Sequence, residues 1–136
     1  MILTVFDTET SGLNPDKHEI LEVAMISFVL DREGNAHLLS EFESKIKPVS
    51  IYTASPKALQ INGYNEDAWK DSPLFADVLK KMTPIIEKSE VFLGQNLIFD
   101  IRFVDELCRR NSIPCPEFPS YIDTKEMADK LVEKAW

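Results

Sequence analysis

The order of the apolar segments along the chain most constrains the fold that it can adopt. Three segments with the β-branched and aromatic composition of strands come first, at residues 2–6, 20–30 and 37–46. Helical periodicity follows over 75–86 and again over 97–111, with a short strand at 90–94 between them. A strand meander followed by alternating helices and strands predicts an α/β fold, in which a mixed sheet is antiparallel at first and then parallel, with flanking helices.

Capping signals bound the helices. Ser55-Pro56 and Ser72-Pro73 each place a hydroxyl before a proline at the first helical position, and Asn62-Gly63 ends the first of these helices. Asp123, three residues before Glu126, forms a capping box. It opens a last amphipathic helix with apolar positions at Met127, Leu131, Val132 and Ala135, and this helix is still running at Trp136.

Length and composition limit the class of protein. The 136 residues are 44% hydrophobic, with eight Phe and two Trp, so we expect a single globular domain over residues 1–136. No segment approaches the roughly 20 consecutive apolar residues that span a bilayer, and the first residues lack the basic start of a signal peptide. We therefore expect a cytoplasmic protein without a membrane partner, whose cysteines, Cys108 and Cys115, are reduced.

The charge of the chain would ordinarily argue against a nucleic-acid partner. The formal net charge is −8, and phosphate backbones attract basic surfaces. The acidic excess is concentrated near the start, because residues 1–50 carry nine acidic and four basic side chains. Part of this excess can therefore belong to a metal site, whose divalent ions would reverse the local charge.

Two groups of polar residues follow predicted strands. Asp7 and Glu9 lie two residues apart at the end of the first strand, so strand alternation points both carboxylates to one face, where they can share Mg²⁺ or Mn²⁺. Asn96 and Asp100 lie at the start of the helix that follows the 90–94 strand. Other readings stay open: such acidic pairs are common by chance, Asn96 can be a helix cap, and Asp100 can complement the helix dipole.

Five stretches in the same order along the chain resemble the DEDD 3′→5′ exonuclease superfamily, most closely the proofreading subunits and related small exonucleases. They are FDTETSGL at 6–13, IKP at 46–48, ALQING at 58–63, GQNLIFDIRFV at 94–104 and IDT at 122–124. The resemblance implies a ribonuclease H-like fold. It also implies metal-dependent hydrolysis of terminal phosphodiesters of DNA or RNA to 5′-nucleotides by a two-metal mechanism.

The resemblance also implies roles for individual residues. Asp7 would bridge two Mg²⁺ or Mn²⁺ ions, Glu9 would bind the first ion, and Asp100 would lie beside the second. The nucleic-acid 3′ end would be bound by Thr8, Thr10, Leu13, Asn96 and Phe103. For Phe103, packing in the core is an equally open interpretation.

The sequence departs from the family in one respect that bears on activity. The family has a third motif, a His or Tyr followed four or five residues later by an Asp, and no His or Tyr of this chain is followed in that way. Asp123 aligns ahead of that motif, and its capping role explains it. We therefore expect a domain incomplete at its C-terminus, with weak or no nuclease activity on its own. The alternative is a catalytically inactive fragment or module of the same fold that binds nucleic-acid ends or takes part in assembly. Besides the nucleic acid, the expected partners are a second copy of the chain and a polymerase or repair protein.

Overall fold

The computed structural model describes residues 1–135. Trp136 and the side chains of Leu131, Val132, Lys134 and Ala135 lie outside the described part. Of the apolar positions predicted for the last helix, Met127 is therefore the one whose surroundings are described, and it is half exposed.

Five strands form one mixed sheet in the order β3-β2-β1-β4-β5. Its members are β1 (Ile2–Thr10), β2 (Ile20–Leu30), β3 (Ala36–Lys45), β4 (Val91–Gly94) and β5 (Ser120–Asp123). The first three pair antiparallel as a meander, whereas β4 is parallel to β1 and β5 is parallel to β4. The predicted fold class is confirmed. The sequence pattern does not predict β5, because most of its four residues are exposed at the sheet edge.

The helices lie between and after the strands. They are the single-turn η1 (Ile51–Thr53), α1 (Pro56–Asn62), α2 (Glu66–Trp69), α3 (Phe75–Lys88), α4 (Leu97–Arg110) and α5 (Thr124–Ala135). The predicted ends of α1 are confirmed, since the Ser55 hydroxyl caps it and Gly63, at a φ of 73°, ends it in the left-handed region.

The predicted start of α3 at Ser72-Pro73 is wrong. The helix begins at Phe75, after Leu74 in an extended conformation, and no side chain caps it. The Pro73 carbonyl instead accepts a hydrogen bond from the Lys47 backbone N–H at 2.8 Å, which ties the connection to the end of the meander. This tertiary contact places the proline two residues before the helix.

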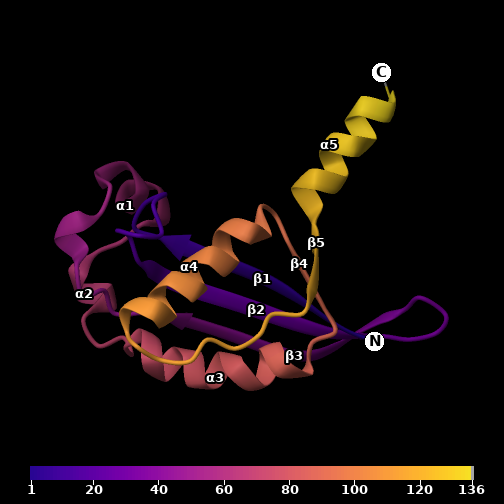
Figure 1. Cartoon of the computed structure of the whole chain (residues 1–136), viewed down its shortest axis with the longest axis horizontal. Coiled ribbons are helices and arrows are strands. Elements are labelled where there is room, and N and C mark those ends of the chain that lie inside the picture. The colour runs from indigo at the N-terminus through magenta and orange to yellow at the C-terminus, as the bar shows by residue number, and fades with distance from the viewer. Residues whose placement is uncertain (136) are drawn as a thin grey trace.

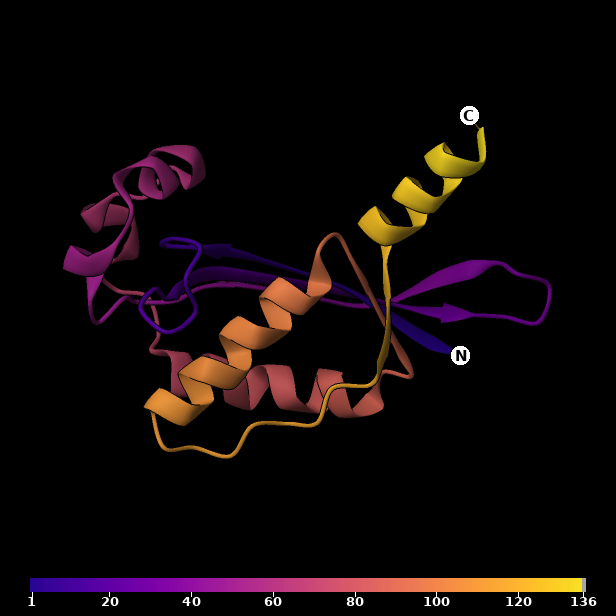
Figure 2. The same cartoon turned by 45° about the horizontal axis from the view of Figure 1, so that its top comes forward.

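Helices α3 and α4 cover one face of the sheet (Figure 2), and the core lies between these layers. On the other face, α1 and α2 lie over one end of the sheet, and α5 projects away from the body of the molecule near the other end (Figure 1). The core is built from Phe6, Val23, Met25, Phe92, Val78, Met82, Ile86, Leu97, Phe103 and Val104, among others. No helix in residues 1–135 is both long and apolar enough to cross a membrane.

Candidate active site

Strand alternation at the end of β1 places two carboxylates on the uncovered face of the sheet. Phe6 and Thr8 are buried on the face covered by helices, whereas Asp7 and Glu9, which alternate with them along the strand, are exposed on the other face. Because β1 and β4 are parallel, the carboxyl ends of both strands meet at this edge, and α4 begins there. The two carboxylates and the start of α4 are thereby brought to the same edge of the sheet.

Asp100 lies in the first turn of α4 and is only 3% exposed. Its carboxylate accepts a hydrogen bond from the Thr8 hydroxyl. Burial, and to a lesser extent the negative charge of Asp7, raise the pKa of Asp100 to about 7, while the Thr8 hydrogen bond acts in the opposite direction. Thr8, predicted as a substrate contact, is thus in this structure a partner of the buried carboxylate.

The open face beside β1 carries acidic side chains in addition to Asp7 and Glu9. Glu9 pairs directly opposite Glu22 on β2. Partial desolvation of the Glu9 carboxyl, together with the negative charges of Asp7 and Glu22, raises its pKa. These residues and Glu43 of β3 line a shallow hollow of about 230 Å³. Glu22 and Glu43 are not predicted as site residues from the sequence. Outward positions in the second and third predicted strands were the available signal, but only the strand register shows that they lie beside Glu9.

The donor chemistry of this edge fits a hard divalent cation. Asp7, Glu9 and Asp100 provide carboxylate oxygens, and burial, with a smaller contribution from the negative charge of Asp7, raises the pKa of both Glu9 and Asp100. The three do not converge, however: within residues 1–135, no group of three His, Cys, Asp or Glu side chains is arranged to hold one ion. Asp100 instead hydrogen-bonds to Thr8, whose side chain points to the opposite side of β1 from Asp7 and Glu9.

The turn after β1 and the start of α4 enclose a second hollow, of about 200 Å³. It is lined by Leu13, Pro15, Asn96, Ile98, Phe99 and Arg102, so two of the predicted substrate residues meet here. The Leu13 side chain is 83% exposed. Thr10 does not line this hollow; its hydroxyl donates to the Gly12 carbonyl at 2.7 Å and closes the turn that presents Leu13.

Phe103 does not lie in this hollow. Its ring is 0% exposed in the core and packs on Phe99, with ring centroids 4.8 Å apart. A ring without an exposed face cannot stack on a base, so the structure favours the core interpretation for Phe103. Phe99 lines the hollow instead. Helical spacing places Phe99 on the same side of α4 as the inward-facing Phe103, so the one available signal was its position in the first turn, next to the exposed Ile98.

Asn96 begins α4 in an unusual way. Its backbone is in the left-handed region, at a φ of 55° and a ψ of 46°, and its side chain makes no capping hydrogen bond. The interpretation of its side chain as a helix cap is therefore wrong. The backbone N–H groups of Asn96 and Leu97 instead donate to Asp123, whose position in the sequence predicts only a cap of the last helix.

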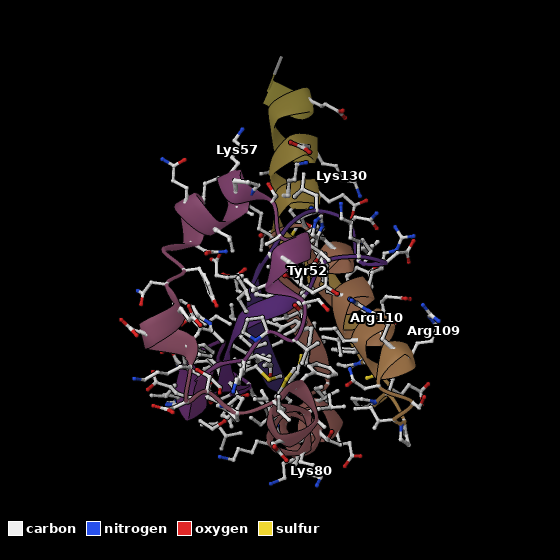
Figure 3. All side chains as sticks on the ribbon, turned by 90° about the vertical axis from the view of Figure 1, so that its left-hand side faces the viewer. Tyr52, Lys57, Lys80, Arg109, Arg110 and Lys130 are labelled. Carbon is white, nitrogen blue, oxygen red and sulfur yellow. The ribbon has the colours of Figure 1, made fainter. Side chains whose placement is uncertain are left out.

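Basic side chains are scattered around the molecule. Figure 3 shows Arg109 and Arg110 near one end of α4, with Lys57 on α1 and Lys80 on α3 well apart from them. Arg109 pairs with Glu106, and Arg110 donates to the backbone carbonyls of Pro15 and His18. Arg102 is the cation that borders the hollow beside Leu13.

Comparison with known proteins gives consistent matches. The RNase_T family model, described as exonuclease, matches residues 4–135. DNA polymerase III subunit epsilon of Treponema pallidum is 29% identical over 131 residues, which cover 94% of this chain and 55% of that protein. Ribonuclease T of Vibrio campbellii is 26% identical over 133 residues, which cover 86% of this chain and 61% of that protein.

The fold has matches among solved structures as well. A crystal structure of Escherichia coli exonuclease I in complex with a dT13 oligonucleotide superposes with a TM-score of 0.72 and 21% identity, covering 90% of this chain and 27% of that one. The chain spans about 55–61% of the length of the two curated relatives named above.

Proposed function

The chain belongs to the RNase_T exonuclease family, as its motifs predict, and on this premise we propose that it forms the metal-binding part of a 3′→5′ exonuclease domain. The proposed reaction is hydrolysis of the terminal phosphodiester of DNA or RNA to a 5′-nucleotide, with Mg²⁺ or Mn²⁺. One observation carries the proposal: Asp7 and Glu9 lie exposed at the edge of the sheet where α4 presents the buried carboxyl of Asp100, whose pKa is raised.

In this proposal each carboxylate has a separate task. Asp7 and Glu9 would hold a divalent cation on the open face, and Asp100, whose carboxylate accepts the Thr8 hydrogen bond in this structure, would add a ligand from α4. When bound, the cations supply charge neutralisation for the phosphate and an activated water. Deprotonated carboxylates are required, so cation binding would favour the ionised form of Asp100 over the protonated one.

The 3′-terminal nucleotide is proposed to lie in the hollow beside α4. Leu13 and Phe99 contribute apolar surface to its lining, and Asn96 contributes an amide group at the start of the helix. Stacking on apolar and aromatic surfaces tolerates any base, which suits an enzyme that removes nucleotides in sequence. Arg102, at the border of the hollow, would lie near the phosphate backbone.

The proposed domain also needs a proton acceptor for the attacking water and a fourth carboxylate. No His or Tyr in the sequence is followed four or five residues later by Asp. We expect these 136 residues to hydrolyse 3′ ends slowly, and a polypeptide or partner that supplies both groups to do so efficiently. By analogy with the relative named as a polymerase subunit, a polymerase is one proposed partner.

The test uses 5′-labelled single-stranded DNA and RNA oligonucleotides of one sequence, with Mn²⁺ or Mg²⁺. We expect the wild-type chain to shorten them slowly and stepwise from the 3′ end, with release of 5′-mononucleotides, and Asp7→Ala to abolish this residual activity. Isothermal titration with Mn²⁺ provides a second measurement that does not depend on turnover. A wild-type chain that binds no Mn²⁺ at millimolar concentration would contradict the proposal.

A non-catalytic function is the second candidate, because the carboxylates of the described residues do not converge on one point. In this case the chain binds nucleic-acid 3′ ends through the hollow beside Leu13 but does not cleave them. The two functions separate experimentally. The non-catalytic one predicts 3′-end binding that is unaffected by Asp7→Ala and by the removal of divalent cations.

A further inference from the structure

One carboxylate joins the start of two helices that are far apart in the sequence. Asp123 Oδ1 accepts hydrogen bonds from the backbone N–H groups of Asn96 at 3.0 Å and Lys125 at 2.9 Å, and Oδ2 accepts one from Leu97 at 3.2 Å. The Glu126 N–H lies 3.4 Å from Oδ1. The side chain at the end of β5 thus caps both α4 and α5.

The start of α4 depends on this outside acceptor. The first N–H groups of a helix have no partner within the helix, and a side chain at the cap position usually accepts one of them. Here the Asn96 side chain makes no such bond, and its backbone is in the left-handed region. Asp123 therefore supplies from β5 the cap that α4 does not supply itself.

The capped turn lies directly against the candidate active site. Gly94 packs so closely on β1 that an added Cβ would lie 2.8 Å from the Phe6 carbonyl oxygen, and Phe6 immediately precedes Asp7. Leu97 is fully buried in the core, and Asp100 follows it by one helical turn. A shift at the start of α4 would therefore move Asp100 relative to Asp7, since the helix moves as a rigid element.

We propose that Asp123 is a positioning residue for the exonuclease site, which fixes the start of α4, and with it Asn96 and Asp100, by tying it to the start of α5. The inference rests on the proposed function for its effect on cation binding, whereas the tie between the helices does not depend on that function. Residues that orient metal ligands through hydrogen bonds affect metal affinity strongly when they are removed.

The shared carboxylate also couples α5 to the site. Helix α5 projects from the end of β5 and contacts β4 and β5 (Figure 1). Because Asp123 is the common acceptor, ordering of the α4 start by a bound cation would favour the hydrogen bonds that begin α5. Coupling of this kind is reciprocal, so a partner that holds α5 would strengthen cation binding in turn.

The experiment compares Asp123→Ala with Glu126→Ala, a matched control in the same turn of α5 that removes the same charge from an exposed side chain. Amide hydrogen exchange, measured without metal, reports on the hydrogen bonds by which Asp123 ties the start of α4 to the start of α5. Mn²⁺ titration reports on whether Asp123 positions the cation-binding residues. We expect Asp123→Ala to accelerate exchange at Leu97 and the next turn of α4 by about tenfold or more, and to weaken Mn²⁺ affinity by about tenfold. Glu126→Ala should change neither. In the wild type, Mn²⁺ should slow exchange at Lys125 and Glu126.

Asp123→Asn keeps one oxygen acceptor and should recover part of both losses, and it also serves if the alanine variant does not fold. Asp123→Asn with unchanged exchange and Mn²⁺ affinity, together with Asp123→Ala that behaves like Glu126→Ala, would overturn the inference. Faster exchange with unchanged Mn²⁺ affinity would also overturn it, because Asp123 would then have a structural role only. If the wild type binds no Mn²⁺, the proposed function fails, and the exchange of Leu97 and Lys125 alone decides whether Asp123 ties the two helices.

Discussion

The Thr8 hydroxyl donates a hydrogen bond to the Asp100 carboxylate, and so joins the end of β1 to the first turn of α4. Asp100 is buried, and charged hydrogen bonds in such surroundings are stronger than those in water. The bond aligns the strand that carries Asp7 and Glu9 with the helix that carries the third carboxylate. It makes the residue between the two acidic positions of the first motif a part of the candidate site.

Replacing Thr8 by valine should therefore destabilise the protein and weaken cation binding. Valine keeps the shape of the side chain but leaves the buried Asp100 carboxyl without this hydrogen-bond donor. We expect the free energy of unfolding to fall by about 1–3 kcal/mol. Urea denaturation measures the first effect, and Mn²⁺ titration of the folded variant measures the second.

Thr10→Val is the matched control on the same strand, because its hydroxyl donates to the Gly12 backbone carbonyl and not to a carboxylate. This variant should lose less stability and should keep its Mn²⁺ affinity. Equal effects of the two substitutions on Mn²⁺ affinity would contradict a specific role for the bond between Thr8 and Asp100.

The sequence predicts those parts of the fold and site that depend on local patterns. Alternation in the first strand correctly places Asp7 and Glu9 on one face, and helical spacing finds the buried side of α4. These features need only the period of a single element, since side chains two apart on a strand, or three to four apart on a helix, share a face. The order of the elements then leaves few arrangements for a mixed sheet.

Features that depend on contacts between distant segments are not predicted. Asp123 fits a local capping box, so its bonds to Asn96 and Leu97 have no signal in the sequence around it. Glu22 lies beside Glu9 only because of the register of β1 against β2. The start of α3 moves for a similar reason, because the Pro73 carbonyl is held by Lys47 of another segment.

Asp7→Asn should stabilise the metal-free protein while it removes cation binding. Burial is the main cause of the raised pKa of Glu9 and of Asp100, and the negative charge of Asp7 adds to both shifts, so Asp7 repels each of these two carboxylates when no cation is bound. Removing this charge should raise the free energy of unfolding at neutral pH by up to about 1 kcal/mol. A lower stability of the variant in the absence of metal would contradict the prediction, because Asp7 would then stabilise the metal-free folded state.

Mn²⁺ should make the wild type more stable than Asp7→Asn, the reverse of the order expected without metal. Added Mn²⁺ should raise the melting temperature of the wild type in a concentration-dependent way, because the cation binds the folded state. It should leave Asp7→Asn unchanged. Glu41→Gln, on the exposed surface of β3, is the control for non-specific screening of the acidic surface, and it should respond to Mn²⁺ as the wild type does.

The loop that carries Leu13 should loosen in acid. Burial, with smaller contributions from the positive charges of Lys17 and Arg110, lowers the pKa of His18 below its ordinary value of 6.5, despite the opposing effect of a hydrogen bond from the ring to the Thr53 backbone. The neutral ring accepts a hydrogen bond from the Asn14 N–H at 3.0 Å through Nδ1. Because the folded state disfavours the proton, the stabilising contribution of His18 is complete above pH 6.5 and is lost as the pH falls through the lowered pKa.

His18→Gln tests this pH dependence, since an amide oxygen can accept from Asn14 without binding a proton. The free energies of unfolding of the wild type and His18→Gln are compared from pH 7.5 downward. We expect the wild type to lose more stability than the variant below about pH 6.5, in addition to the acid destabilisation common to both. Parallel pH profiles for the two proteins would contradict the prediction.

Gly12→Ala should disrupt the same loop, independently of pH. An added Cβ at this position would lie 2.3 Å from the His18 ring, which is held by its hydrogen bond to Asn14. One of the two must move, so we expect a loss of about 1–3 kcal/mol in unfolding free energy. Gly34→Ala, in the exposed hairpin turn with open space around it, controls for the loss of a glycine. Gly34→Ala should lower stability only through backbone strain, and the amide exchange rates of the Leu13 loop should stay the same.

Leu13 and Phe103 should separate substrate binding from stability. Leu13 is exposed beside the hollow, so Leu13→Ala should leave the unfolding free energy within about 0.5 kcal/mol of the wild type. Its affinity for the 3′ end of a single strand should fall at least about fivefold, the lower end of what one lost base contact costs. Phe103→Leu should do the reverse, lowering stability by about 1 kcal/mol or more and leaving the affinity of the folded protein unchanged.

Fluorescence anisotropy of a 5′-labelled oligonucleotide, with Ca²⁺ to limit cleavage, measures the affinity. A 3′-phosphorylated oligonucleotide tests whether the terminal hydroxyl is recognised. Weaker binding by folded Phe103→Leu, with Leu13→Ala unaffected, would return the base contact to Phe103 and require the core around α4 to open.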